Sequence, residues 1–347
     1  MNRRLTFAYP GDLNLKTGGY AYDRELIAGL RALGWEIDLL ALGDGFPSPS
    51  GETLRLAEEK LSSVSDGELL VIDGLAFGVL DGWAVANHDR LGIIALVHHP
   101  LALETGIAGD ARDALLASER DALAVARHVV VTSNATAREV ATLFGVDPTR
   151  ITTALPGTKN GRPSTSNGIV PHILAVGTLI ERKGHDILVD ALKSIEHLEW
   201  RTSIVGSRTL DPVTSLSLEK RIAEHDLQSR ITLCGEVEDT RSLMADADIF
   251  ALASRYEGYG MVFAEALAQG LPIVACRAGA IPEVVPEEAG FLVAVDDVTA
   301  FAQALETLIL DPKMRALKAE GSARAGQKLP GWEETAQAVS KLLETLK

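Results

Sequence analysis

The chain has 347 residues, of which 46% are apolar and 23% charged, with a net charge of −15. Its length favours two domains, and its composition is that of an ordinary globular protein. The excess of acidic residues argues against non-specific binding to nucleic acid, which needs a basic face.

The first half of the chain alternates strand and helix signals. Short apolar runs predict buried strands at residues 5–9, 37–42, 69–72, 93–97 and 128–132. Apolar residues at helical spacing predict helices at residues 20–33, 118–126 and 135–144. Strands separated by helices imply right-handed parallel crossovers and a sheet covered on both faces.

A stretch rich in Gly, Pro, Ser, Thr and Asn at residues 155–171 interrupts this pattern and predicts an exposed connection. A second alternating series follows it. Strands are expected at residues 173–176, 202–205, 231–234, 249–253, 273–275 and 291–293. Helices are expected at residues 185–195, 215–225, 240–245, 298–310, 312–321 and 332–346. The predicted organisation is an N-terminal domain at 1–157, a linker at 158–171, a second domain at 172–328 and a final helix within 329–347.

Residues 254–283 carry the most informative pattern. Glu257 lies in a Gly-rich turn after a buried strand, and Glu265 follows eight residues later on a helix predicted at 261–269. A helix N-terminus presents backbone N–H groups that suit a phosphate. A carboxylate can accept two hydrogen bonds from a vicinal diol. Phosphate donors beside diol acceptors are what a nucleotide sugar requires.

The order of these features resembles the retaining family-4 glycosyltransferases. Their signature, E-G-[FY]-G-x-x-x-x-E-A-x-A-x-G-x-P, has every fixed position present from Glu257 to Pro272. The resemblance implies an α/β glycosyltransferase-B fold: two Rossmann-like domains with a ligand-binding cleft between them and a C-terminal helix that crosses back. It assigns the acceptor to the N-terminal domain and the nucleotide sugar to the second. It also implies that Glu265 holds the ribose diol and Glu257 the donor-sugar hydroxyls.

Two further motifs fit this resemblance. Gly177 opens a loop spelled G-T-L-x-x-R-K, in which Arg182 and Lys183 stand side by side. Two cations near a departing diphosphate would offset the charge that develops on it. Gly18 and Gly19 precede a helix, where paired glycines let the backbone approach a ligand closely.

Other positions are assigned by the resemblance alone. It places a histidine at the end of the fourth strand facing the donor sugar, which we assign to His98, with His99 as the alternative. It implies backbone contacts to the nucleotide base in the loop after strand 231–234. The family has two glycines before I-P-E, and here Ala280 replaces the second. This replacement weakens the assignment of Gly279 to a loop over the donor sugar. The expected catalytic residues are His98, Arg182, Lys183 and Glu257. The expected donor-binding residues are Gly18, Gly19, Gly177, Gly235, Val237, Gly258, Tyr259, Gly260, Met261, Val262 and Glu265.

The expected reaction is transfer of a hexose from a UDP- or GDP-sugar with retention and without a metal. No metal-binding D-x-D follows a strand, and Asp296-Asp297 is interpreted as a helix cap. Nucleotide-sugar 2-epimerases of the same fold and a non-catalytic nucleotide-sugar binding protein remain alternatives. A dehydrogenase is disfavoured because no G-x-G-x-x-G follows a strand. The acceptor stays open, and Glu104 and Thr105 are more simply surface loop than acceptor contacts.

The expected location is the cytoplasm. The N-terminus has no apolar core of a signal peptide, and no segment is long enough for a membrane span. Cys234 and Cys276 both lie in strand-like runs and are interpreted as buried small hydrophobes in a reducing compartment. Residues 1–157 hold 13 Lys and Arg against 21 Asp and Glu without a basic cluster. Peripheral contact with anionic lipid is therefore not favoured, and a soluble or glycan acceptor is.

Overall fold

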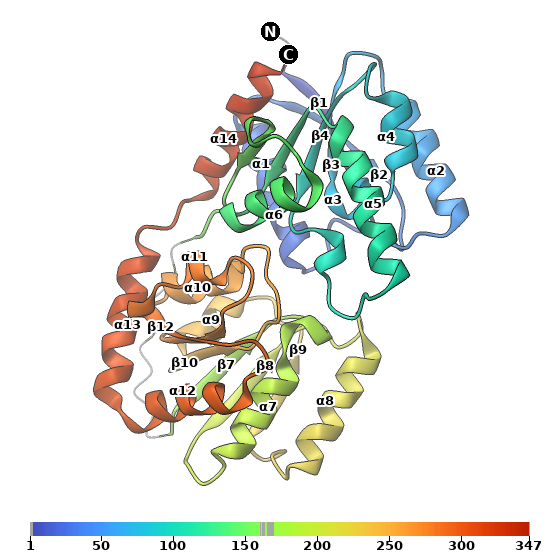
Figure 1. The fold of residues 1–347 in the computed structure, drawn as a ribbon. Coiled ribbons are helices and arrows are strands. Elements are labelled where there is room, and N and C mark those ends of the chain that lie inside the picture. The colour runs from blue at the N-terminus through green and yellow to red at the C-terminus, as the bar shows by residue number, and fades with distance from the viewer. Residues whose placement is uncertain (1–2, 160, 162–163, 165–169, 347) are drawn as a thin grey trace. The chain divides into compact units, whose positions relative to one another are not determined.

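The computed structural model describes residues 3–159, 161, 164 and 170–346. The chain forms two compact units, one made of Met1–Gly157 with Pro330–Lys347 and the other of Thr158–Leu329 (Figure 1). Most of the predicted linker at 158–171 lies outside the described residues. Each unit contains one parallel six-stranded sheet with helices, which confirms the predicted α/β class.

The sheet of the first unit has the strand order β2-β1-β3-β4-β5-β6. Its strands are β1 Arg4–Tyr9, β2 Glu36–Ala41, β3 Leu69–Asp73, β4 Gly92–Val97, β5 His128–Val131 and β6 Ile151–Thr153. Its helices are α1 Gly18–Ala32, α2 Gly51–Ser62, α3 Gly74–Phe77, α4 Asp81–Asn87, α5 Asp110–Val125 and α6 Asn134–Phe144. The sequence patterns predicted β1 to β5, α1, α6 and the second half of α5.

Four elements of this unit were not predicted. Helix α2 buries only Ala57 and Leu61, so it has no continuous apolar stripe to recognise. Helices α3 and α4 are short, and β6 is a three-residue strand at the edge of the sheet. Short elements carry too few residues to show a period.

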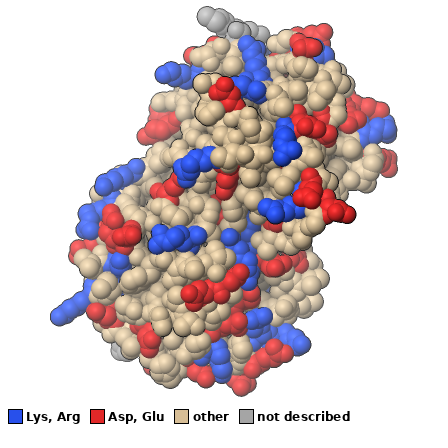
Figure 2. All heavy atoms as spheres, in the orientation of Figure 1, with Lys and Arg blue, Asp and Glu red and all other residues tan. Residues whose placement is uncertain are grey.

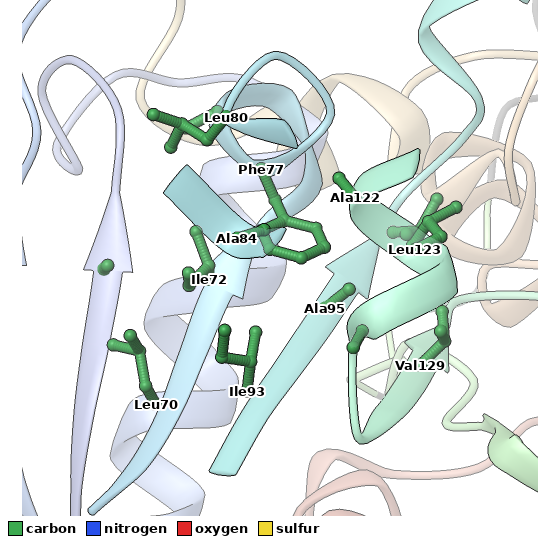
Figure 3. Close-up of a cluster of buried hydrophobic side chains, with 14 of the residues drawn as sticks. Leu70, Ile72, Phe77, Leu80, Ala84, Ile93, Ala95, Ala122, Leu123 and Val129 are labelled. Carbon is green, nitrogen blue, oxygen red and sulfur yellow. The ribbon is translucent and has the colours of Figure 1, made fainter. Parts of the chain in front are cut away.

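The core of the first unit lies between its central strands and the covering helices. Ile72 of β3 and Ile93 of β4 are fully buried, as are Phe77 of α3 and Leu123 of α5 (Figure 3). Each such side chain contributes roughly 1.5–3 kcal/mol of transfer free energy. Strands β3 and β4 are parallel neighbours, so their carboxyl ends lie at the same edge of the sheet.

Glu119 is an acid buried in this unit. Its side chain on α5 is 1% exposed, Oε2 accepts a hydrogen bond of 2.9 Å from the N–H of Leu101, and Oε1 has no partner among the described residues. Burial raises the pKa of Glu119 to about 8. The carboxyl therefore stays protonated in the folded protein at a pH where the unfolded chain has already lost the proton.

We expect Glu119→Gln to stabilise the protein selectively in alkaline solution. Below the pKa of a glutamate in the unfolded chain, Glu119 is protonated in both the folded and the unfolded state, so its ionisation does not affect stability. Above that pKa the stability of the wild type falls as pH rises, up to a pH of about 8. Glutamine keeps the acceptor and cannot ionise, so at pH near 9 the variant should gain about 3–5 kcal/mol relative to wild type. Denaturant unfolding at pH about 5 and about 9 measures this, with the exposed Glu36→Gln as control. An equal difference at both pH values would show that Glu119 is not held protonated.

The sheet of the second unit has the order β12-β11-β10-β7-β8-β9. Its strands are β7 His172–Val176, β8 Arg201–Val205, β9 Ile231–Gly235, β10 Ile249–Leu252, β11 Ile273–Cys276 and β12 Gly290–Val293. Its helices are α7 His185–Ser194, α8 Pro212–Glu224, α9 Thr240–Ala245, α10 Met261–Ala268, α11 Ile281–Val284, α12 Val298–Leu310 and α13 Pro312–Gly326. The expected capping role of Asp297 is confirmed, because its carboxylate accepts from the N–H of Ala300 at the start of α12.

The last helix, α14 Trp332–Thr345, packs against α1 of the first unit (Figure 1). A Cβ on Gly29 of α1 would lie 2.5 Å from the Cβ of Ala336, so the two helices approach closely only because glycine has no side chain. The indole of Trp35 donates a 2.9 Å hydrogen bond to Ser340. The prediction that the C-terminal helix crosses back is confirmed.

The prediction for Cys234 was wrong. Cys276 is buried in β11, but Cys234 is exposed on β9. Strand β9 is an edge strand whose residues alternate between buried or half-buried and exposed, so an apolar run there does not imply full burial. In the part of the chain that the structure describes, no helix is long and apolar enough to cross a membrane.

Candidate functional site

The site in the second unit is built by loops that follow β7 and β10. These strands are parallel neighbours in the centre of the sheet, so their carboxyl ends lie at the same edge. The loop after β7 carries Arg182 and Lys183, and the loop after β10 carries Glu257. The structure brings these three predicted residues together.

Glu257 is 6% exposed and paired with both cations. Its Oε1 accepts hydrogen bonds of 2.7 Å from Lys183 Nζ and 2.6 Å from Ser254 Oγ. Its Oε2 lies 3.5 Å from Arg182 Nη1, which also donates a 2.9 Å bond to the carbonyl of Tyr256. Burial opposes the charged form, but Lys183 and Arg182 outweigh it and lower the pKa of Glu257. The group is therefore an oriented carboxylate between two cations.

The loop that carries Glu257 is held by close contact with the backbone of the loop after β11. Gly279, in the loop after β11, has φ 51°, and a Cβ there would lie 2.2 Å from the carbonyl oxygen of Glu257. The N–H of Ala280 donates a 2.9 Å hydrogen bond to the same oxygen. The candidate position Gly279 therefore supports the backbone of Glu257.

Arg255 joins the loops of the second unit and was not found by sequence reasoning. Its guanidinium bonds both carboxylate oxygens of Asp186 at 3.1 and 2.7 Å, the carbonyl of Glu181 at 2.6 Å and Oδ1 of Asp296 at 2.8 Å. Its backbone N–H donates to the carbonyl of Arg182. A bidentate arginine with 17% side-chain exposure is a rigid link. Arg255 thus holds the loop of Arg182 and Lys183 against the loop of Glu257.

The N-terminus of α10 lies next to Glu257. Gly260 takes φ 89° there, no side chain caps the helix, and a Cβ on Gly260 would lie 3.7 Å from the Cβ of Glu257. The first residues of the helix, Met261 and Val262, are half-buried. An uncapped helix start offers N–H donors and a positive dipole end to an anion. Gly258 and Tyr259, the latter 7% exposed, complete the predicted turn.

Glu265 lies on the second turn of α10 and is half-buried. Burial raises the pKa of Glu265 to about 7, and Arg241 opposes that rise. None of the described residues hydrogen-bonds its carboxylate. Its charge at neutral pH therefore depends on what it binds.

Gly177 and Gly235 begin loops at the same edge of the sheet. The N–H of Gly177 donates to Val205 at the end of β8, and the N–H of Gly206 donates to the carbonyl of Gly235 at the end of β9. His185, buried at the start of α7, approaches the carbonyl of Gly177 with Nε2 at 3.1 Å. Burial lowers the pKa of His185 to about 4, so its neutral ring tethers this loop. Val237, two residues past Gly235, is half-buried.

The first unit holds a second group of predicted residues. His98 follows β4, and a Cβ on Gly19 at the start of α1 would lie 3.4 Å from His98 Cδ2. Gly18 begins the same helix, where Thr17 is the N-cap. His99 instead faces Glu104, with Nε2 3.3 Å from a carboxylate oxygen. The structure thus gives the two histidines different surroundings, and His98 lies against Gly19.

Asp23 and Asp73 contact His98 and were missed by sequence reasoning. Nε2 of His98 lies 3.1 Å from Asp23 Oδ1 and 3.6 Å from Asp73 Oδ2. A signal existed for each: Asp23 lies on the buried face of α1, and Asp73 ends the apolar strand β3. An acid in an apolar stripe is rarely without a partner.

Comparison with known proteins finds similarity over much of the chain. Residues 170–311 match the family model described as Glycosyl transferases group 1. The D-inositol 3-phosphate glycosyltransferase of Xylanimonas cellulosilytica is 30% identical over 291 residues, covering 74% of this chain and 67% of that protein. The lipopolysaccharide core biosynthesis mannosyltransferase LpsB of Rhizobium meliloti is 28% identical over 211 residues. That match covers 59% of this chain and 60% of LpsB, less than two thirds of its length.

A solved structure extends the comparison to the whole fold. Sucrose-phosphate synthase from Thermosynechococcus elongatus superposes with a TM-score of 0.83 at 22% identity and covers 99% of both chains. At this identity the likeness concerns the fold alone. It confirms the predicted glycosyltransferase-B plan of two Rossmann-like sheets and a returning C-terminal helix.

Proposed function

This chain belongs to the glycosyl transferases group 1 family, and we propose that it is a retaining, metal-independent glycosyltransferase. It moves a hexose from a UDP- or GDP-sugar to a soluble or glycan acceptor. The observation that carries the proposal is the pairing of Lys183 and Arg182 with Glu257 beside the uncapped start of α10. Cations and helix N–H groups suit a diphosphate, and the carboxylate suits sugar hydroxyls.

The proposed chemistry follows from these charges. As the bond between the anomeric carbon and the phosphate oxygen breaks, the electron pair stays on the diphosphate. Arg182 and Lys183 stabilise that charge, since a guanidinium has five donors and an ammonium three and each can bond an anion as well as Glu257. The acceptor oxygen bonds the anomeric carbon on the same face, and its proton passes to the departing phosphate. Glu257 holds hydroxyls of the donor sugar, and His98 is proposed as a further catalytic residue.

The acceptor is proposed from charge and from relatives. The two relatives compared differ in their named functions, one in lipopolysaccharide core biosynthesis and one on D-inositol 3-phosphate. Figure 2 shows Lys and Arg interspersed with Asp and Glu on the visible face of both units. This mixed surface supports a soluble or glycan acceptor over an anionic lipid surface.

Ligand-induced stabilisation tests the proposal. Purified protein is heated with UDP, GDP, ADP, their common sugars or NAD, each with and without a chelator. A ligand at about 100 times its dissociation constant stabilises by roughly 2.7 kcal/mol. Stabilisation by one nucleoside diphosphate and its sugar, unchanged by chelator, is expected. Stabilisation by NAD alone, or by no nucleotide, would refute the donor assignment, and isomerised sugar nucleotide without acceptor would indicate an epimerase.

We expect Glu265→Gln to remove a pH dependence of donor binding. A ribose diol bonds the carboxylate form, so affinity should weaken as pH falls below the pKa of about 7. The dissociation constant of a sugar nucleotide, whose phosphates do not titrate in this range, should rise up to about tenfold per pH unit below neutrality. The glutamine variant should bind more weakly at pH about 8 and show no such slope. Calorimetry at several pH values measures it, and equal slopes in both proteins would refute the ribose assignment.

A further inference from the structure

Two buried carboxylates flank one nitrogen of His98. Asp23 on α1 is fully buried and Asp73 at the end of β3 is 2% exposed, and both face Nε2 at 3.1 and 3.6 Å. The three side chains come from three different elements, so the fold has to assemble them. Burying two carboxylates costs free energy unless a cation compensates. The arrangement therefore serves something beyond packing.

The ring of His98 has one orientation. A Cβ on Gly19 would lie 3.4 Å from Cδ2 and 3.6 Å from Nε2, so this edge of the ring faces α1. The ring of Tyr22 packs edge-on at a centroid distance of 5.3 Å. No described residue hydrogen-bonds Nδ1, and the side chain is 18% exposed. Since the carboxylates occupy Nε2, Nδ1 is the nitrogen that can meet a ligand.

We propose that Asp23 and Asp73 are positioning residues that orient His98 and make its Nδ1 a hydrogen-bond donor toward a bound substrate. A neutral ring with its proton on Nε2 presents Nδ1 as an acceptor, whereas a protonated ring presents an N–H there. The carboxylates therefore decide what Nδ1 can do. This inference rests on the proposed function, in which His98 is one of the catalytic residues.

The charges of the surrounding groups support this assignment. Burial opposes the charge on His98, but Asp23 and then Asp73 outweigh it and raise the pKa of His98 to about 10. Burial and the charge of Asp73 raise the pKa of Asp23 to about 7, while hydrogen bonds from His98, Asp23 and Leu75 outweigh burial and lower the pKa of Asp73. Tyr20 and Tyr22 of α1 also face the cluster, and burial raises the pKa of both, so they stay neutral. Near neutral pH the His98 cation therefore faces the Asp73 carboxylate and an Asp23 side chain that is close to its pKa.

The proposal is tested by NMR titration of the His98 ring in the full chain. The ring Cε1–H signal is assigned by its loss in His98→Gln. In wild type it should not titrate below pH about 9, well above the ordinary value for histidine. In Asp23→Asn and Asp73→Asn, the midpoint should fall by at least about one pH unit. Asp121→Asn, which changes an exposed acid of α5, should leave the midpoint unchanged.

Kinetics and metal analysis complete the test. Both asparagine variants should slow release of nucleoside diphosphate at least about tenfold and leave the dissociation constant of the nucleoside diphosphate unchanged. A titration midpoint of His98 at about 6.5 in the wild type would overturn the proposal, as would a midpoint that neither variant changes. So would a stoichiometric metal that Asp23→Asn removes, because the three groups would then be ligands. If Asp23→Asn does not fold, Asp73→Asn alone decides. An elevated midpoint in a protein that binds no nucleoside diphosphate would refute the proposed function and leave the orientation of His98 standing.

Discussion

Replacing Lys183 by methionine should lower the rate of nucleoside diphosphate release from the sugar nucleotide by about 100- to 1,000-fold. The reason is the loss of a cation where negative charge develops, an effect of about 3–4 kcal/mol in comparable sites. Methionine matches the length of the lysine stem and packs similarly. Steady-state kinetics with the donor identified by thermal shift measures this loss, and water can serve as acceptor.

The same change also removes a partner from a buried carboxylate, and the two effects have to be separated. Glu257 would keep Ser254 and Arg182 but lose the 2.7 Å bond from Lys183, so its pKa should rise and the fold should weaken. In the double variant Lys183→Met/Glu257→Gln the orphaned charge is gone, so stability should return toward wild type. Turnover should stay low, because the cation is still missing and Glu257 no longer presents a carboxylate to the donor sugar. If the double variant recovers turnover, Lys183 acts only by holding Glu257.

Sequence reasoning found the parts of the site that lie at strand ends. Arg182, Lys183 and Glu257 follow β7 and β10, and parallel neighbouring strands must end at one edge. His98 at the end of β4 was assigned by the family resemblance, which did not name its partners. Nothing in a single sequence says that Asp23, on the buried face of a helix, meets Asp73 and His98, because that meeting depends on how α1 packs on the sheet.

Three of the misses lie at or next to the edges of the two sheets. Cys234 lies on an edge strand, where an apolar run does not guarantee burial. Strand β6 is likewise an edge strand of three residues. Helix α2 follows β2, the opposite edge strand of that sheet, and buries only two side chains. Periodicity reports burial, so elements that bury little are the ones it overlooks.

Gly279→Ala should reduce both stability and turnover strongly, whereas Ala280→Gly should have little effect on either. At position 279 the backbone has φ 51° and a Cβ would lie 2.2 Å from the carbonyl oxygen of Glu257, so the loop of Glu257 must move. A loss of about 2–4 kcal/mol and a fall in turnover of at least about tenfold are expected.

Position 280 is the matched control for this substitution. Ala280 has φ −84° and donates only its backbone N–H to Glu257, so a glycine there keeps the contact. Glycine also restores the second glycine of the family motif. Its greater backbone entropy in the unfolded state should lower stability by about 1 kcal/mol. Denaturant unfolding and donor turnover are measured on both variants. They show whether the close backbone approach at Gly279 or the match to the family motif at position 280 matters for the site. If Ala280→Gly were the more damaging change, the close approach at Gly279 would not be what holds Glu257 in place.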